Sequence, residues 1–211
     1  TATGISLHTN LGRAPMSAAA VQALVAASRY VDVEFDVAAG TRAQRGRGAL
    51  GALRTAVPRA EQALAVNNGA AALVLCTTAL AAGKEVLVSR GEMVEIGDGF
   101  RLPDLIASTG ARLREVGTTN RTGLADYAAA VTDQTGCILK VHPSNFRVEG
   151  FTSSVEVREL AKLGVPVVAD VGSGLLGPDP LLPDEPDVDT ALGAVAALVP
   201  CSGDQLLGVP H

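Results

Sequence analysis

Short apolar runs alternate with segments of helical periodicity along most of this sequence. The expected strands are the apolar runs at residues 63–66, 86–88, 112–116, 137–141, 165–170 and 197–199. The expected helices lie at 17–28, 49–60, from the 67–72 turn to 82, and at 101–109, 124–131, 154–163 and 188–194. This alternation is typical of βαβ units. It predicts a three-layer α/β fold, in which helices cover both faces of a mainly parallel sheet.

The N-terminal part has a different pattern. Residues 1–16 are rich in Gly, Thr and Asn and are expected to form an extended arm, while residues 17–211 are expected to form one large domain. Pro15 suits the start of the helix that follows the arm. Residues 31–48 contain three glycines together with Arg42, Arg45 and Arg47, which predicts a flexible basic loop.

Composition narrows the class of protein. Hydrophobic residues make up 47% of the 211 positions and aromatic residues only 3%, so the core must be built from aliphatic side chains. A net charge of −5 argues against a general nucleic-acid binder. No apolar run is long enough to span a bilayer and no signal peptide is visible, which predicts a cytoplasmic protein. The three cysteines have neither metal-ligand nor disulfide spacing.

Polar residues follow each expected strand. They lie at positions 67–68, 89–92, 117–121, 142–145, 170–174 and 202–204. Ligands of open α/β sheets bind beyond the carboxyl ends of the strands, so we expect these residues to form one site at one edge. Glu92 and Glu95 fall in one of these loops, where we expect a surface role.

Two of these loops carry candidate chemistry. Asn67, Asn68 and Gly69 open a helix, whose exposed N–H groups can bind phosphate; an ordinary Asn/Gly helix cap is the alternative. Asp170 ends an apolar strand, where its carboxylate can hold the proton of a cofactor ring nitrogen or simply cap the next turn. His142 can stack on such a ring or serve a structural role.

Further polar residues extend this set. Asn145 and Arg147 belong to the same loop as His142 and can reach the same ligand. Arg42, Arg45 and Arg47 are the strongest anion-binding candidates, because guanidinium groups suit phosphate and other oxyanions. A solvated basic loop is the alternative. The chain has no P-loop, nucleophile-elbow or zincin motif, so nucleotide hydrolysis, α/β-hydrolase and zinc-protease functions lack support.

Several blocks together resemble bacterial selenocysteine synthase, L-seryl-tRNA(Sec) selenium transferase. They include LHTNLGRAP at 7–15, LREVGTTNRT at 113–122, LKVHPSNFRVEGFT at 139–152, VPVVADVGSG at 165–174 and SGDQLLG at 202–208. The matching blocks cover nearly the whole chain in order. The resemblance implies the large domain of a fold type I (aspartate aminotransferase-like) enzyme that depends on pyridoxal 5'-phosphate (PLP).

The resemblance also implies an activity and partners. The family converts seryl-tRNA(Sec) to selenocysteinyl-tRNA(Sec) with selenophosphate, through an aminoacrylyl intermediate on PLP, and it forms homo-oligomers. By resemblance, Asn67, Asn68 and Gly69 would lie near the cofactor phosphate, and Ser202, His142 and Asn145 would also bind the cofactor. Asp170 would face the pyridine nitrogen. Arg42 and Arg45 would approach selenophosphate or the tRNA acceptor end.

The chain departs from the family pattern in three places. Gln205 stands at the position of the lysine that binds PLP as a Schiff base, and a carboxamide cannot form an imine. Arg-Ala-Gln-Arg at 42–45 replaces the usual Arg-Gly-Ser-Arg, and the family extends beyond both ends of this chain, so we expect a truncated chain. Our hypothesis is that the isolated chain binds PLP without covalent attachment and does not form the selenocysteinyl product.

Two alternatives stay open. One is a related PLP-dependent lyase that acts on a small amino acid or sugar acid. The other is a non-catalytic subunit that binds PLP or serves in assembly.

Overall fold

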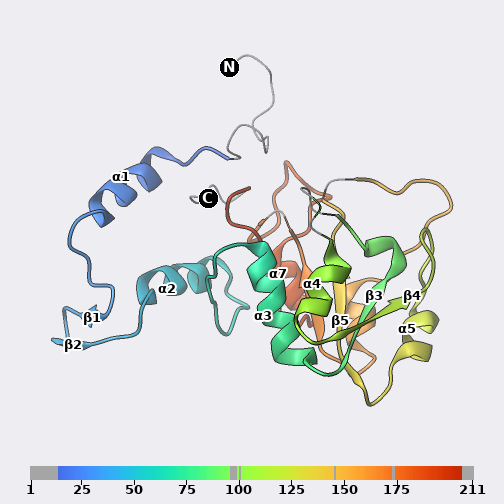
Figure 1. Cartoon of the computed structure of the whole chain (residues 1–211). Helices are drawn as coiled ribbons and strands as arrows, with labels where there is room; N and C mark the ends of the chain where they lie inside the picture. The colour runs from blue at the N-terminus through green and yellow to red at the C-terminus, as the bar shows by residue number, and fades with distance from the viewer. Residues whose placement is uncertain (1–13, 96–98, 100, 145, 173, 206–211) are drawn as a thin grey trace. The chain divides into compact units, whose positions relative to one another are not determined.

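The chain divides into two compact units in the computed structural model (Figure 1), which describes residues 14–95, 99, 101–144, 146–172 and 174–205. The first unit comprises residues 1–65 and 203–211, and the second comprises residues 66–202. Each unit is defined by the contacts among its own residues. The boundary between an arm at 1–16 and a domain at 17–211 stays a prediction, since residues 1–13 lie outside the described part.

A four-stranded parallel sheet forms the centre of the second unit, in the order β4-β3-β5-β6. Its strands are β3 (Glu85–Ser89), β4 (Arg112–Val116), β5 (Thr135–Val141) and β6 (Val167–Asp170). The register places Val86 beside both Leu113 and Cys137. All pairings are parallel, so the carboxyl ends of the four strands meet at one edge, as the alternation of runs predicts.

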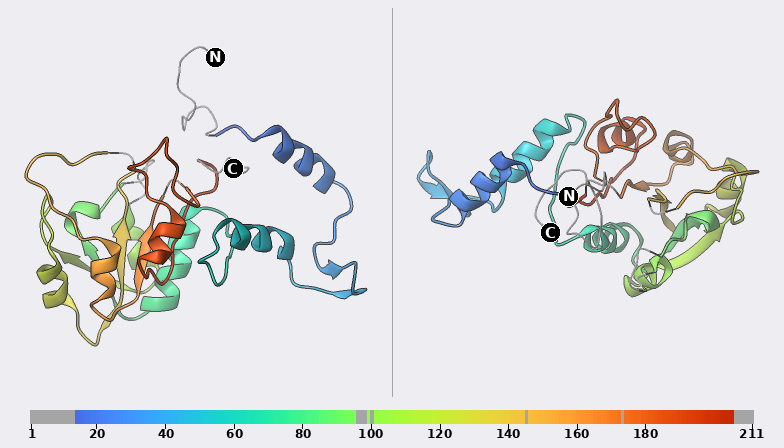
Figure 2. Two further views of the ribbon diagram at one scale, coloured as in Figure 1. Left: turned by 180° about the vertical axis from the view of Figure 1, so that it is seen from behind. Right: turned by 90° about the horizontal axis from the view of Figure 1, so that it is seen from above.

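Helices cover both faces of this sheet, which confirms the predicted three-layer α/β fold (Figure 2). On one face lie α3 (Gly69–Ala81) and α4 (Leu102–Ser108); on the other lie α5 (Leu124–Ala130) and α6 (Val157–Ala161). Successive strand residues point to opposite faces. Leu139 accordingly packs with α3 and α4, whereas its neighbour Ile138 packs with α5 and α6. Helix α7 (Val188–Gly193) lies beside α6, where Arg158 donates to the carbonyl of Gly193 (3.2 Å).

The first unit has almost no core of its own. It contains α1 (Ala18–Ala27), the antiparallel pair β1 (Phe35–Asp36) and β2 (Thr41–Arg42), and α2 (Arg47–Ala56). Ser17 caps α1 by accepting a hydrogen bond from the amide of Ala20 (3.1 Å). Val57 is the only buried residue among the described positions of this unit. No helix in the described part of the chain is long and apolar enough to cross a membrane.

Three sequence expectations about secondary structure were wrong. Residues 63–66 form no strand, because an apolar run alone does not supply a pairing partner, and none is present among the described residues. Residues 197–199 make one isolated parallel bridge, Val168 to Leu198, in place of a strand. The expected flexible loop at 31–48 contains the β1–β2 pair, whose turn closes through a hydrogen bond from the amide of Gly40 to Asp36 (2.8 Å).

The close packing of α3 on β5 gives a test of this architecture. A Cβ atom added at Gly136 of β5 would lie 2.6 Å from the Cα and Cβ of Ala81, inside van der Waals contact. We expect Gly136→Ala to push α3 off the sheet and lower the free energy of unfolding by about 1–3 kcal/mol. Urea denaturation followed by far-UV circular dichroism measures this loss.

Gly177→Ala is the matched control, because a Cβ added there meets no atom within 4 Å. Its unfolding free energy should stay within about 0.5 kcal/mol of the unmodified chain. Equal stability of the two variants would contradict the packing described here.

Candidate functional site

Polar residues from the ends of all four strands line one cavity of about 940 Å³ in the second unit. Ser89 ends β3, the loop 118–122 follows β4, His142 follows β5, and Asp170 ends β6. The expectation that polar strand ends converge on one edge is therefore confirmed for these four strands. The residues after the other two expected strands, at 67–68 and 202–204, do not line this cavity.

Asp170 is the most strongly perturbed acid of the site. Burial raises the pKa of its carboxyl to about 6, and a hydrogen bond from the amide of Gly172 (3.1 Å) offsets only part of that increase. Its backbone carbonyl accepts a hydrogen bond from the amide of His142 (3.0 Å). Among the described residues, no cationic side chain forms an ion pair with Asp170.

The carboxyl group of Asp170 faces the helix α3. Val168 packs in the core cluster of α3 and α4, and Asp170, two residues later on the same strand, points to the same face. Burial raises the pKa of Cys76, on α3, and the negative charge of Asp170 raises it further. Burial, followed by the negative charge of Asp170, also raises the pKa of Cys201. The carboxylate therefore lies in an apolar environment against this helix.

The N-terminus of α3 joins the same region through a short series of contacts. Asn68 caps the helix, since its Oδ1 accepts a hydrogen bond from the amide of Ala71 (2.8 Å). A Cβ atom at Gly69 would lie 2.9 Å from the Oγ of Ser202, so a side chain there would force the Ser202 hydroxyl to move. The amide of Ser202 in turn donates to the carbonyl of Gly172 (3.0 Å), two residues beyond Asp170.

His142 lies half-buried at the end of β5. Its Nε2 is 4.0 Å from Oε1 of Glu185. Burial lowers the pKa of the imidazole, and the nearby Glu185 only partly offsets that change. The lowered pKa favours the neutral imidazole, which can stack on a ring or hydrogen-bond to a ligand. Asn145 lies outside the described residues.

A buried ion pair that the sequence did not predict joins the loop after β3 to β5. The Nζ of Lys140 lies 2.5 Å from Oε1 of Glu92, and Oε2 of Glu92 accepts a hydrogen bond from the amide of Val141 (3.0 Å). The expected surface role of Glu92 was wrong, because its side chain is buried. Glu95, by contrast, is exposed and pairs with Arg101 (2.9 Å). Lys140, inside an apolar strand, could have predicted an ion pair from the sequence, because a buried lysine needs a counter-charge.

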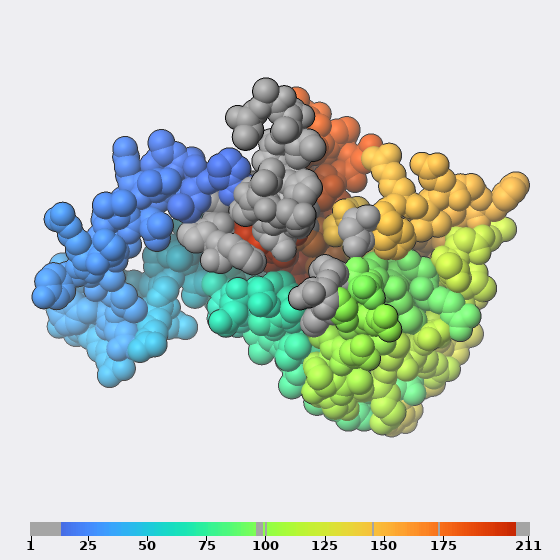
Figure 3. Space-filling model, turned by 45° about the horizontal axis from the view of Figure 1, so that its top comes forward, coloured from blue at the N-terminus to red at the C-terminus, as the bar shows by residue number. Residues whose placement is uncertain are grey.

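Hydrogen bonds join the loop 118–122 to the end of β3 and to the segment 151–153, and together these form one wall of the cavity. Ser89 and Thr122 share a hydrogen bond between their hydroxyl groups (2.7 Å). The Nδ2 of Asn120 donates to the carbonyl of Phe151 (2.8 Å), and the amide of Ser153 donates to the carbonyl of Asn120 (3.0 Å). The segment 146–152, gold in Figure 3, lies on the surface of the second unit. The wall is thus fixed by paired backbone and side-chain groups.

The remaining predicted site residues divide between the two units. Asn67 is exposed at the bend before α3, in the second unit. Arg42 and Arg45 belong to the first unit and both form ion pairs with Glu34. Gln205 also belongs to the first unit, half-buried in a bend. In the described part of the chain, no group of three or more His, Cys, Asp and Glu side chains is placed to hold a metal ion.

The residues of the second unit fit the cofactor that the resemblance implies. PLP has a ring nitrogen that is stabilised when protonated next to a carboxylate, and Asp170 is a partly buried carboxylate with no cationic partner among the described residues. PLP also carries a phosphate, and α3 presents a helix N-terminus whose first residue, Gly69, has no side chain. Position 205, where the resemblance predicts the lysine that binds the cofactor covalently, is a glutamine.

Solved structures define the class of protein. The D-glucosaminate-6-phosphate ammonia-lyase superposes with a TM-score of 0.69 at 19% identity, over 96% of this chain and 53% of that one. A SepCysS–SepCysE N-terminal domain complex matches with a TM-score of 0.54 at 12% identity, over 77% of this chain and 43% of that one. At such identities the likeness concerns the fold alone. The fold is that of the PLP-dependent fold type I enzymes.

Sequence comparison then gives the family. The family model for L-seryl-tRNA selenium transferase (SelA) matches residues 1–211, and the chain belongs to this family. The L-seryl-tRNA(Sec) selenium transferase of Methylocella silvestris is 52% identical over 220 residues, which cover 99% of this chain. That of Moorella thermoacetica is 48% identical over 221 residues, covering all of this chain. The chain spans 46% of the length of either relative. Family membership supports PLP as the cofactor.

The raised pKa of Asp170 predicts a particular pH dependence of stability. The ordinary value of 3.8 applies to the unfolded chain and about 6 to the folded one, so the folded state holds the proton more tightly. Stability from this group is therefore present below pH 3.8 and is lost as the pH rises through 6. Relative to Asp170→Asn, the unmodified chain should lose on the order of 2–3 kcal/mol between pH 4 and 7.5.

Urea unfolding followed by the near-UV dichroism of tyrosine measures this difference. The chain has two tyrosines, of which Tyr127 is buried in the second unit and Tyr30 is fully exposed, so the signal reports on the second unit. Parallel pH profiles for the unmodified chain and Asp170→Asn would show that the carboxyl titrates normally.

Proposed function

We propose that this chain is the cofactor-binding part of an L-seryl-tRNA(Sec) selenium transferase and holds PLP between the N-terminus of α3 and Asp170. The observation that carries the proposal is the partly buried carboxyl of Asp170, whose pKa is raised to about 6 and which faces α3 without a cationic partner among the described residues. When bound, PLP supplies an electron sink that acidifies the Cα–H bond of an attached amino acid.

Asp170 keeps a proton on the ring nitrogen of the cofactor. An adjacent cation favours the ionised form of a carboxyl group, so binding lowers the pKa of Asp170 from its raised value. The apolar surroundings that disfavour the lone carboxylate strengthen its attraction to this cation. The cost of burying Asp170 in the free chain is thereby offset in the bound one.

The N-terminus of α3 holds the phosphate. The first N–H groups of a helix have no partner within it, and Asn68 caps only that of Ala71. The N–H groups of Gly69 and Ala70 lie at the same helix end and can donate to phosphate oxygens, together with the hydroxyl of Ser202. The hydroxyl of Ser202 lies where a side chain at Gly69 would crowd it, so Gly69 lets this hydroxyl lie beside the helix N-terminus.

Gln205 limits the chemistry. Its carboxamide cannot bond to the cofactor aldehyde, and it is too weak a base to remove the Cα proton of a seryl group. We therefore propose that the chain binds PLP without covalent attachment and does not complete the transfer. Gln205 is also the observation that favours a second candidate function, that of a non-catalytic subunit that binds PLP.

The partners follow from the family. Seryl-tRNA(Sec) and selenophosphate are the proposed substrates of the whole protein, with Arg42 and Arg45 as the residues that meet the anionic ligand. A homo-oligomer in the cytoplasm is the proposed assembly. The substrates and the assembly are proposed for the whole protein, of which this chain is one part.

Equilibrium dialysis with PLP tests the proposed cofactor site. The unmodified chain should bind PLP saturably, and Asp170→Asn should weaken binding about tenfold or more because a neutral amide does not stabilise the pyridinium. Gly69→Ala should weaken binding more mildly, because its Cβ would displace the Ser202 hydroxyl that is proposed to donate to the phosphate. Gly177→Ala is the control and should bind normally. Absence of saturable binding, or equal affinity of all variants, would refute the site.

A second experiment restores the missing amine. Gln205→Lys should acquire a PLP-derived mass at residue 205 after borohydride reduction, because a primary amine condenses with the aldehyde. Gln205→Arg, which adds a cation without a reactive amine, should acquire none there. Peptide mapping separates residue 205 from the chain's three native lysines, Lys84, Lys140 and Lys162. If PLP binds Gln205→Lys but never attaches at residue 205, the assignment of this position is wrong.

A further inference from the structure

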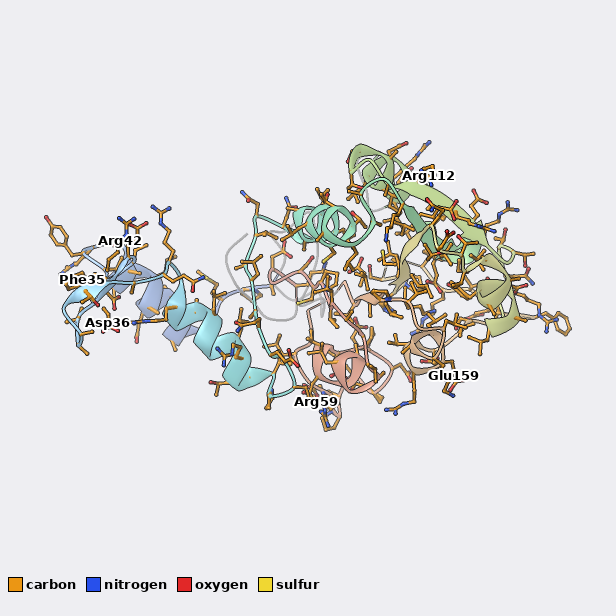
Figure 4. The ribbon with its side chains drawn as sticks, turned by 90° about the horizontal axis from the view of Figure 1, so that it is seen from below. Phe35, Asp36, Arg42, Arg59, Arg112 and Glu159 are labelled. Atoms are coloured by element: carbon orange, nitrogen blue, oxygen red, sulfur yellow. The ribbon has the colours of Figure 1, made fainter. Side chains whose placement is uncertain are left out.

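Two arginines of the first unit converge on one carboxylate. Glu34 lies immediately before β1, and the Nη2 of Arg42 donates to its Oε2 (3.2 Å). The Nε of Arg45 donates to its other oxygen, Oε1. The amide of Ala43 donates to the backbone carbonyl of Glu34 (2.7 Å), so the arrangement is anchored across the hairpin. Figure 4 labels Phe35, Asp36 and Arg42 on this hairpin.

The third arginine of the loop is engaged elsewhere. The Nη1 of Arg47 donates to Oδ2 of Asp36, and this hydrogen bond is the largest cause of the lowered pKa of Asp36. The other oxygen of Asp36 accepts hydrogen bonds from the amides of Ala38 (3.0 Å) and Ala39 (3.1 Å). Asp36 and Arg47 thus hold the turn, whereas Glu34 meets Arg42 and Arg45.

The cluster of Glu34, Arg42 and Arg45 is open to solvent. The side chains of Arg42 and Arg45 are 83% and 77% exposed, and that of Glu34 is 36% exposed. Ion pairs at such exposure are weak and exchange readily with ions from solution. Two guanidinium groups that each hold one oxygen of the same anion have the arrangement that suits an oxyanion.

We propose that Glu34 is a built-in competitor that occupies the oxyanion site of Arg42 and Arg45 until a ligand displaces it. Its two carboxylate oxygens mark where two oxygens of a tetrahedral oxyanion of the phosphate class bind. The ligand must break both ion pairs and also meets the repulsion of the displaced carboxylate. Glu34 therefore lowers the affinity of the site. This inference rests on the proposed function only in taking Arg42 and Arg45 as the anion-binding residues.

Inorganic phosphate is the probe that tests this role. The backbone amide signals of residues 34–47 and the Nε–Hε signals of the arginines are followed by NMR during a phosphate titration at constant ionic strength and pH 7.5. Glu34→Gln should lower the phosphate Kd roughly three- to tenfold, because both competing pairs lose their charge. Replacement of both Arg42 and Arg45 by Gln should abolish the saturable change in the amide signals.

Asp32→Asn is the matched control, since it removes one negative charge two residues before Glu34 but leaves intact both the Glu34 cluster and the pair of Asp36 and Arg47. Its phosphate Kd at Arg42 and Arg45 should stay within about twofold of the unmodified chain. An equal gain from Asp32→Asn would reveal a general charge effect and overturn the proposal. An unchanged or higher Kd in Glu34→Gln would also overturn it. Either failure leaves PLP binding by the second unit unaffected, so it is distinguishable from failure of the proposed cofactor site.

Discussion

A partly buried carboxylate at the end of a parallel strand is the constraint on which the rest of this site depends. Asp170 lies in apolar surroundings that raise its pKa to about 6, and one backbone amide is its only hydrogen-bond donor among the described residues. Such a group destabilises the chain at neutral pH unless a cation meets it. The protonated ring of PLP is the cation that the fold and family supply. The same burial that costs stability in the free chain therefore makes the site selective for a positively charged ring.

The parallel sheet delivers this carboxylate and the phosphate-binding helix to the same region. Its strands end at one edge, and the alternation of side chains turns Asp170 toward α3 while Lys140 faces the opposite side. The contacts from Gly172 to Ser202 and from Ser202 to Gly69 then connect the strand end with the helix N-terminus. The buried pair of Glu92 and Lys140 fixes the neighbouring strand end. A ligand with a cationic ring at one end and a phosphate at the other matches this layout.

Sequence patterns predicted the elements that are specified locally. Residues 112–116 form the expected strand, and the helix after Asn68 begins as expected, because apolar runs and a capping residue act over a few positions. The run at 63–66 misled the prediction, since strand formation also needs a neighbouring strand. Long-range pairs could not be predicted from the sequence for a related reason. Glu92 and Lys140 are 48 residues apart, and nothing in either local sequence specifies the other. The pairing of Glu34 with Arg42 and Arg45 could not be predicted either, because it spans eight and eleven residues and depends on the hairpin fold.

We expect bound PLP to lower the pKa of Asp170, and carbon NMR of its carboxyl group measures this change directly. Titration of the Asp170 carboxyl carbon in the free chain should give a pKa of about 6. With saturating PLP the carboxyl should stay ionised to below about pH 4, because the ring nitrogen places a positive charge beside it. An identical titration with and without bound PLP would contradict the account, since Asp170 would then not meet the cofactor ring.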